Sequence, residues 1–498
     1  MLTRREFLKA VPGIGVAVGL GATGCALPRR EETPSLVNDV QSKLNSTRVR
    51  NVVPVQSVDA LRLELQNARI GNRPVSIAGG RHAMGGQQFC ADATLLDMSG
   101  MNRVLSFDRA RGIVEVEAGI QWPELVNYLS TAQEGQARQW GILQKQTGTD
   151  RLSIGGALAA NAHGRGLRFK PMIGDVESFV LMDAGGALRT CSRGENTDLF
   201  RLAIGGYGLF GLIVSVRLRL GVRQKVERIV EVLDLEDLIP VFEQRISDGS
   251  LYGDFQYMTD AESDGFLRRG VASRYRPVSD ERPVPSGQKA LSAEDWKTLS
   301  YLAHVDKKKA FEVYAKYYLS TSGQIYWSDT QQLTTYVDDY HEEVDRRLTR
   351  REKGSEMLTE LYVPRRELVH FLEAVRRDCR EHGVDVIFGV FRLIEKDEES
   401  FLAWAKENYV CIIFNLHVVH SESGIAKATA DFRRLIDRAI ERGGSYYLTY
   451  HRWATRRQVE ACYPQFVEFL RLKKKYDPGE RFQSDWYRHY KKMFADKL

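Results

Sequence analysis

Two glycine-rich stretches, one of them built around a histidine, place the strongest constraint on how this chain folds. The first, SIAGGRHAMGGQ, spans residues 76–87, and the second, SIGGALAANAHGRG, spans residues 153–166. A backbone without Cβ atoms can approach a ligand closely, and that ligand is often a phosphate. Neither standard nucleotide motif fits, because no GxGxxG opens a helix after the first strand and no GxxxxGKS/T occurs. We therefore expect two separate loops to hold one flat or anionic ligand without a Rossmann or P-loop arrangement.

The charge balance and the cysteine spacing exclude two classes of function. The formal net charge is +6, of which +2 belongs to residues 1–25, so only +4 is spread over the rest of the 498 residues. This density of positive charge gives no case for binding nucleic acid. Apart from Cys25, five cysteines are widely spaced, and none forms a CxxC or Cys/His pair with metal-ligand spacing. We expect these five to be buried thiols, and we expect no metal site.

The N-terminus predicts export. Residues 1–25 contain TRREFLKA, then twelve mostly apolar or small residues, and this pattern resembles a twin-arginine signal centred on Arg4 and Arg5. Twelve residues are too few to span a bilayer, which needs about twenty; a buried N-terminal helix is the alternative. LGATGC resembles a lipoprotein processing box, which leaves a lipid anchor on Cys25 open. The twin-arginine route carries folded proteins, so we expect a bound cofactor and a location in the periplasm or on the outer face of the cell membrane.

The rest of the chain predicts an α+β protein with two domains. Residues 26–50 are polar, contain two prolines and are predicted to be a linker. Residues 51–225 alternate short apolar strands with helical segments, and 211–222 alternates as a half-exposed antiparallel strand would. Residues 226–445 mix apolar strands with long charged helices, which indicates a cap domain on an antiparallel sheet. Residues 446–498 form a separate C-terminal segment.

Three sequence blocks, in this order, resemble the FAD-binding domain of the vanillyl-alcohol-oxidase family, also called the p-cresol-methylhydroxylase type. The blocks are GGRHAMGGQ, GTDRLSIGGALAANAHGRG and DLFRLAIGGYGLFGLIVSVRLRL. The first block resembles the corresponding loops of cytokinin dehydrogenases and alditol oxidases. The resemblance implies a two-subdomain FAD-binding domain over 51–225, a substrate-binding cap over 226–445, and a C-terminal segment that returns to the FAD domain. In such enzymes the histidine of the first loop is commonly bonded to the flavin 8α-methyl carbon, so FAD linked through His82 is expected here.

The resemblance assigns a set of backbone and side-chain contacts to FAD. The amides of the first loop would hold the pyrophosphate, while the histidine reaches the isoalloxazine; Ala83 stands where a serine is usual. The cofactor residues implied are Ala78, Gly79, Gly80, Arg81, His82, Ala83, Gly86, Gln87, Thr147, Gly148, Ser153, Gly155, Gly156, Ala160, His163, Gly164 and Ile213.

Five residues are candidates for contact with substrate. His163 resembles a position that faces flavin and substrate in decaprenyl-phosphoryl-ribose oxidase and sugar-lactone oxidases. The C-terminal block YYLTYHRWA is similar to the tail of decaprenyl-phosphoryl-ribose oxidase, with Tyr450 where that enzyme has a lysine and His451 next to it. Glu360, on a strand that resembles a substrate-contacting cap strand, and Arg392 complete the set.

The sequence thus predicts an FAD-dependent oxidoreductase that takes hydride to flavin N5 from a C–H bond beside a hydroxyl or amine of a small polyol, sugar or alcohol. One of His163, Tyr450 or His451 would assist removal of the hydroxyl proton. The electrons would pass to dioxygen or to an electron acceptor of the cell envelope. Two alternatives stay open: an enzyme with non-covalent FAD and a polyprenyl-linked or other amphipathic substrate at the membrane face, and a catalytically silent flavin-fold binding module.

Overall fold

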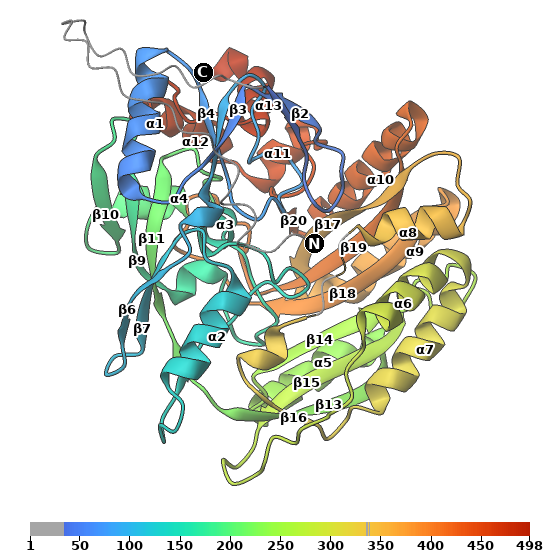
Figure 1. Ribbon diagram of the computed structural model, residues 1–498. Coiled ribbons are helices and arrows are strands. Elements are labelled where there is room, and N and C mark those ends of the chain that lie inside the picture. Colours follow the sequence, from blue (N-terminus) through green and yellow to red (C-terminus); the bar gives the residue numbers. More distant parts are fainter. Residues whose placement is uncertain (1–33, 335–336, 338) are drawn as a thin grey trace, which may run out of the picture. The chain divides into compact units, whose positions relative to one another are not determined.

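A computed structural model describes residues 34–334, 337 and 339–498 (Figure 1), and the following concerns this part of the chain. The predicted export signal at 1–25 and the first part of the predicted linker, 26–33, lie outside the described residues. Among the residues described, no helix has both the length and the apolar character needed to cross a bilayer.

Residues 34–50 are not a linker but part of the folded domain. Strand β1 (Ser35–Val37) pairs antiparallel with β2 (Thr47–Val49). The buried carboxylate of Asp39 between them accepts hydrogen bonds from Ser42 and Asn45. The polar residues that suggested a linker therefore form a turn, in which their side chains make hydrogen bonds to nearby backbone groups.

The first sheet carries the first glycine-rich loop at its edge. It has three parallel strands in the order β3 (Asn51–Pro54), β5 (Thr94–Asp97) and β4 (Val75–Ala78). Helix α1 (Val58–Ile70) packs beside it, and Ser57 caps the helix by accepting a hydrogen bond from the amide of Ala60. The first loop leaves the carboxyl end of β4 directly, so the sheet fixes where the loop begins.

The second sheet is antiparallel and positions the second loop. Its strand order is β10 (Leu188–Ser192), β9 (Val176–Met182), β11 (Leu212–Arg219), β7 (Ile113–Glu117) and β6 (Val104–Asp108). The expectation of a half-exposed strand over 211–222 is wrong for most of β11, because β11 lies between β7 and β9 and both of its faces are largely covered. Associated elements are α2 (Trp122–Ala132), α3 (Ile154–Ala160), α4 (Thr197–Ala203) and the short pair β8 (Trp140–Gly141) and β12 (Gly221–Val222).

The predicted cap is built on one antiparallel sheet of eight strands. In order, these are β16 (Ile325–Trp327), β13 (Lys225–Asp234), β15 (Arg269–Pro277), β14 (Tyr252–Tyr257), β18 (Val386–Ile394), β19 (Tyr409–Val419), β17 (Gly354–Pro364) and β20 (Ser445–Tyr446). Helices α9 (Leu368–Glu381) and α10 (Glu422–Ile440) pack against β17 (Figure 1). The other cap helices are α5 (Leu235–Ser247), α6 (Ala293–Val305), α7 (Lys307–Leu319) and α8 (Tyr340–Arg347). The α+β class predicted from the sequence is confirmed.

The C-terminal segment ties the chain back to its beginning. It contains α11 (Arg456–Cys462), α12 (Phe466–Tyr476) and α13 (Asp485–Met493). The amide of Val75 donates to the carbonyl of Arg481 at 2.7 Å, and the amide of Gln483 donates to the carbonyl of Val75 at 2.9 Å. Residues 447–452, which precede these helices, lie next to the first glycine-rich loop, where the amide of Met84 donates to the carbonyl of Thr449.

Candidate active site

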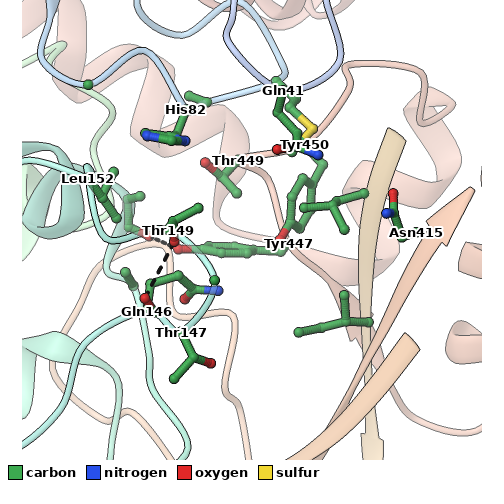
Figure 2. Close-up of a pocket in the computed structure, with 18 of the residues that line it drawn as sticks. Gln41, His82, Gln146, Thr147, Thr149, Leu152, Asn415, Tyr447, Thr449 and Tyr450 are labelled. Atoms are coloured by element: carbon green, nitrogen blue, oxygen red, sulfur yellow. Dashed lines mark hydrogen bonds between the residues drawn. The ribbon is translucent and has the colours of Figure 1, made fainter. Parts of the chain in front are cut away.

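A cavity of about 460 Å³ lies where the two glycine-rich loops, residues 447–450 and the cap sheet meet. Figure 2 shows His82 and Leu152 on one side of it, Tyr450 and Asn415 on the other, and Tyr447 between them. The hydroxyl of Tyr447 donates to the carbonyl of Ala160 at 2.7 Å, which ties the C-terminal segment to the second loop. Segments far apart in the sequence therefore form one wall.

The two glycine-rich loops touch. A Cβ atom added at Gly79 would lie 2.1 Å from Ser153 Oγ, and one added at Gly80 would lie 2.2 Å from the carbonyl oxygen of Arg151. At Gly155 a Cβ would lie 2.7 Å from the Cβ of Ala118. Real Cβ atoms do not approach that closely, so glycine at 79 and 80 allows the two loops to meet, and glycine at 155 allows the second loop to pack against Ala118.

The first loop leaves backbone donors available. Within the described part of the chain, the amides of Gly79, Gly80 and Arg81 donate to no backbone carbonyl. Arg81 adopts the left-handed conformation, with φ 59°, so the loop turns sharply after two glycines. Successive amides in such a turn form an anion-binding concavity. These residues therefore fit the pyrophosphate of FAD, and the histidine that follows lies on the same cavity wall.

The loop is fixed from behind by the C-terminal segment. The amide of Met84 donates to the carbonyl of Thr449 at 3.1 Å, and Gln87 Nε2 donates to the carbonyl of Leu448 at 2.7 Å. Arg452 Nη1 donates to the carbonyl of Gly85 at 2.9 Å. The loop thus keeps its shape through contacts with the chain itself, which is what pre-organised ligand binding requires.

Most of the residues that the resemblance assigns to FAD line this cavity, and four do not. Those that line it are Gly79, Gly80, Arg81, His82, Ala83, Gln87, Thr147, Gly148, Ser153, Gly155, Gly156, Ala160 and Ile213. Ala78 ends β4 and is buried, Gly86 lies under the guanidinium of Arg452, and His163 with Gly164 lies behind the wall.

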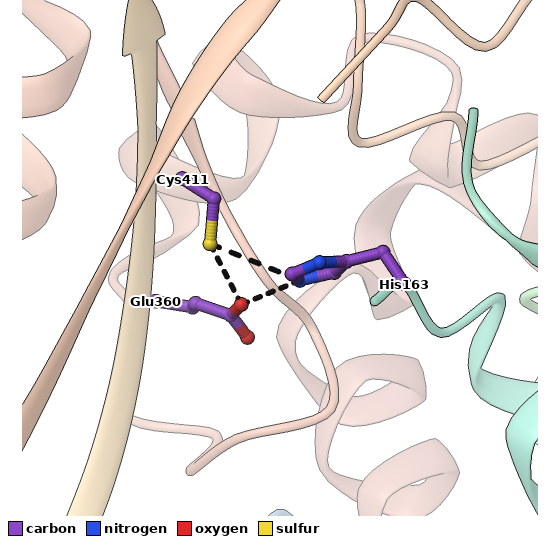
Figure 3. Close-up of side chains that lie close together, drawn as sticks. All are labelled: His163, Glu360 and Cys411. Carbon is purple, nitrogen blue, oxygen red and sulfur yellow. Dashed lines mark hydrogen bonds and ion pairs between the residues drawn. The ribbon is translucent and has the colours of Figure 1, made fainter. Parts of the chain in front are cut away.

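Three buried side chains meet behind the cavity wall (Figure 3). His163 follows α3, Glu360 is on β17 and Cys411 is on β19. His163 Nε2 lies 2.6 Å from Glu360 Oε1, and Cys411 Sγ lies 2.8 Å from the same oxygen. Tyr450, which does line the cavity, donates its hydroxyl to Glu360 Oε2 at 2.8 Å. One carboxylate therefore connects a cavity-facing phenol to a buried imidazole.

The hydrogen bonds of His163 determine how many protons the cluster holds. Nδ1 lies 3.1 Å from the carbonyl oxygen of Gly164, and a carbonyl only accepts, so Nδ1 carries a proton. The contact of 2.6 Å between Nε2 and Glu360 then needs one further proton between the two groups. Atoms this close form hydrogen bonds and do not leave room for a shared zinc ion, whose ligands at 2.0–2.3 Å would lie about 3.3 Å apart.

The ionisation of the cluster follows from these contacts. Burial alone would raise the pKa of Glu360, but His163, the Cys411 thiol and Arg392 together hold that pKa below its ordinary value. Burial and the neighbouring carboxylate raise the pKa of Tyr450 and of Cys411 well above their ordinary values. The stable state is thus a carboxylate that accepts from a neutral phenol, a neutral thiol and the imidazole.

Two further catalytic candidates are separated by the structure. Arg392 on β18 lines the cavity, is 5% exposed, and has no hydrogen-bond or ion-pair partner for Nε and Nη1 among the described residues. His451 does not line the cavity, although it follows Tyr450 directly. It is stacked on Trp453 with ring centroids 4.3 Å apart, and burial lowers its pKa to about 4. The prediction of a catalytic role for His451 therefore has no geometric support, because the chain turns it to the opposite side.

A second cluster in the cap, His304, Glu356 and His417, also brings metal-ligand atom types together. Arg350 Nη2 approaches His304 Nδ1 at 3.3 Å and can only donate, so that nitrogen accepts and Nε2 carries the proton. Nε2 then donates to Glu356 at 2.8 Å. No lone pair of His304 remains for a metal ion in this arrangement.

Two residues of the cavity wall and one residue behind it were not among the sequence candidates. Gln41 comes from the segment predicted to be a linker, and Tyr447 comes from the C-terminal block, three residues before Tyr450. Cys411 was expected to be an ordinary buried thiol, and only its neighbours distinguish it. The two consecutive tyrosines in YYLTYH were the one available signal, since buried tyrosines usually have a hydrogen-bond partner.

The fold and the site define an FAD-binding protein, and comparisons with known proteins agree. Residues 49–192 match the family described as FAD binding domain. The L-gulono-1,4-lactone dehydrogenase of Mycobacterium tuberculosis is 24% identical over 88% of this chain and 94% of its own length. The decaprenylphosphoryl-beta-D-ribose oxidase of Mycolicibacterium smegmatis is 22% identical over 85% of this chain and 91% of its own length. The mouse L-gulonolactone oxidase is 31% identical, over 33% of this chain and 35% of its own length.

This chain is an FAD-dependent oxidoreductase, as its sequence predicts. Its FAD-binding domain is of the p-cresol-methylhydroxylase type, and two proteins that are similar to it along most of its length are named as a dehydrogenase and an oxidase.

Proposed function

We propose that this protein oxidises a carbon that bears a hydroxyl group, with FAD bound between the two glycine-rich loops and the substrate between FAD and the cap sheet. FAD, when bound, supplies the acceptor for the hydride of the substrate C–H bond. The observation that carries the proposal is the hydrogen bond of 2.8 Å from Tyr450 on the cavity wall to Glu360 behind it. The names of the similar proteins, which act on a lactone or a ribose, support an alcohol-like substrate.

Tyr450 relays the hydroxyl proton rather than acting as a phenolate. Its phenol is already donating to Glu360, so its oxygen can accept a hydrogen bond from the substrate hydroxyl. As the C–H bond breaks, the substrate proton moves to the Tyr450 oxygen and the tyrosine proton moves to Glu360 Oε2. Glu360 is the end of this path, because His163 already holds a proton on Nδ1 and shares another between Nε2 and the second carboxylate oxygen, so His163 orients the carboxylate.

Arg392 holds a substrate oxygen. A buried guanidinium with unpartnered N–H groups is costly unless a ligand provides an acceptor. Its position on the cavity wall is suited to a hydroxyl, carbonyl or anionic oxygen of the substrate. We assign it to substrate positioning.

The flavin is attached to His82 in this proposal. His82 lines the cavity beside the amides that fit the pyrophosphate, and it stands at the position of the family's linked histidine. The test is fluorescence of the denatured protein band under ultraviolet light. The wild type and a His370→Ala control, changed at an exposed histidine on α9, should fluoresce, and His82→Ala should not. A dark wild-type band with released FAD would contradict the covalent link.

We further propose that the protein works in the cell envelope, exported by Arg4 and Arg5 and held by lipid on Cys25. Fractionation of cells that express the full chain tests both parts. Replacing Arg4 and Arg5 by lysine should retain the protein in the cytoplasm, and Cys25→Ser should release it from the membrane fraction. Unchanged distributions would remove the respective proposal.

The activity itself is tested by mixing the purified holoprotein anaerobically with lactones, sugars, polyols and simple alcohols and following loss of the oxidised-flavin absorbance. Bleaching by at least one of these compounds is the expected result. Reoxidation by air, compared with reoxidation by an artificial acceptor, then separates an oxidase from a dehydrogenase. Bound FAD that none of them reduces would support a binding module instead.

A further inference from the structure

The cavity does not end at the flavin site. It continues between helices α6 and α7 on one side and strands β14 and β18 of the cap sheet on the other. We name this part the cap arm and define it by its apolar lining: Tyr257, Trp296, Leu299, Ala303, Ala310, Phe311, Tyr314, Ile387, Phe388 and Val390. Gln256, Thr259, Ser300 and Lys307 are the polar side chains on the same walls.

Each helix contributes one continuous stripe to the cap arm. On α6 the lining residues are 296, 299, 300 and 303, and on α7 they are 307, 310, 311 and 314. Both sets follow the i, i+3, i+4, i+7 spacing of a single helix face. Seven residues of helix span about 10 Å, so the arm follows both helices for about that length. Small side chains at Ala303 and Ala310 leave space that a larger residue would fill.

Two of the polar groups on these walls are already paired. Tyr257 donates its hydroxyl to the carbonyl of Ile413 at 2.7 Å. Lys307 Nζ donates to the carbonyls of Ala303 and Val386 at 3.0 and 2.6 Å and pairs with Asp385 at 2.9 Å. A polyol needs a partner for each hydroxyl that it buries, whereas a hydrocarbon chain needs none.

We infer that the substrate carries an aliphatic chain, which occupies the cap arm while its hydroxyl-bearing end lies at Tyr450 and Arg392. The inference rests on the proposed alcohol oxidation for the position of the hydroxyl end. The apolar walls supply the binding free energy of the chain, and the polar groups at the flavin end fix which carbon is presented. Remote apolar contact of this kind positions the reacting end.

A series of 1,2-alkanediols tests the chain directly. From 1,2-propanediol to 1,2-hexanediol and 1,2-octanediol, kcat/KM for flavin reduction should rise about fourfold for each added methylene. Ala303→Trp, which fills the arm from α6, should remove this rise with chain length. Val313→Trp is the matched control, because Val313 is on α7 but 37% exposed and outside the cavity.

A binding measurement separates the arm from the chemistry. cis-Parinaric acid, a fluorescent fatty acid, should bind the holoprotein and the Val313→Trp variant one to one, and at least tenfold more weakly to Ala303→Trp. Ala310→Trp replaces Ala303→Trp if the latter does not fold with FAD. The inference would be overturned if sugars reduce the flavin, kcat/KM does not change along the diol series, and all variants bind parinaric acid equally. The proposed function would then still stand. Parinaric acid binding lost only in the arm variants, with no alcohol reducing the flavin, would uphold the arm and overturn the proposed function.

Discussion

Replacing Tyr450 by phenylalanine tests the proton relay with the smallest change of shape. The ring and its packing against Tyr447 remain, with centroids 5.7 Å apart in the wild type, and only the hydroxyl is lost. That hydroxyl makes one hydrogen bond of 2.8 Å to the buried carboxylate of Glu360. A hydrogen bond to a charged group contributes about 1.5–3 kcal/mol, so the free energy of unfolding should fall by no more than that.

The loss of rate should be much larger than the loss of stability explains. Removing a positioned proton-transfer group typically lowers the rate by about 10²- to 10⁴-fold, so flavin reduction in Tyr450→Phe should slow by at least 10²-fold. Single-turnover stopped-flow with the best substrate from the alcohol screen measures this step. Tyr463→Phe is the matched control, because it removes one buried phenol that donates to the carbonyl of Tyr446 away from the cavity.

The relay is refuted if Tyr450→Phe reduces its flavin within about threefold of the wild-type rate. An equal fall in the rate of flavin reduction in Tyr463→Phe would show a general effect of losing a buried hydroxyl, and it would also refute the relay. Retained FAD and a thermal melting temperature close to that of the control confirm that the comparison concerns chemistry.

Three further predictions concern the loops, the substrate and the pH profile. Gly155→Val forces a side chain against Ala118, where a Cβ would already lie 2.7 Å away, and should lower stability by about 1–3 kcal/mol with loss of bound FAD. Gly194→Ala, which has open space around it, should lower neither the stability nor the amount of bound FAD. Thermal melts measure the stability, and flavin absorbance measures the bound FAD. Arg392→Gln should lower kcat/KM about 10- to 100-fold through loss of substrate contact, and an unchanged kcat/KM would show that the guanidinium serves another purpose. The pKa of Glu360 lies below its ordinary value of 4.5, and the pKa of Tyr450 lies well above 10. The relay should therefore be intact between these two limits. It should fail as the pH falls below about 4.5, because Glu360 then gains a proton. An acid limb of flavin reduction near neutral pH, unchanged in Glu360→Gln, would contradict this assignment.

The sequence predicted the cofactor class well because the chemistry of close backbone approach is local. Glycines that allow close packing, such as those at positions 79, 80 and 155, can be read directly from the sequence, and the order of the blocks that contain them carried the resemblance to FAD enzymes. By contrast, the predicted linker failed over 34–50, because polar residues that bond to each other in a turn have the same composition as residues exposed to solvent.

Residues at the substrate end were only partly predictable. Glu360 and Tyr450 were both singled out, but nothing in the sequence indicates that they touch, because ninety residues separate them. His451 was a reasonable candidate by type and neighbourhood, and a single turn of the backbone directs it against Trp453. Cys411 joined the cluster through the strand order β18-β19-β17, which depends on long-range pairing.

The amino-acid sequence by itself predicted an FAD-binding domain, because the glycines of two separate loops, whose lack of side chains permits close approach of a ligand, can be read directly from the sequence. Only the tertiary structure decided which polar groups share a proton and how far the cavity extends beyond the flavin. Both depend on side chains from separate strands and helices meeting within about 3 Å, and hydrogen bonding at that range is set by packing and not by spacing along the chain. The hydrocarbon-lined arm between α6, α7 and the cap sheet is therefore a property of the folded molecule alone.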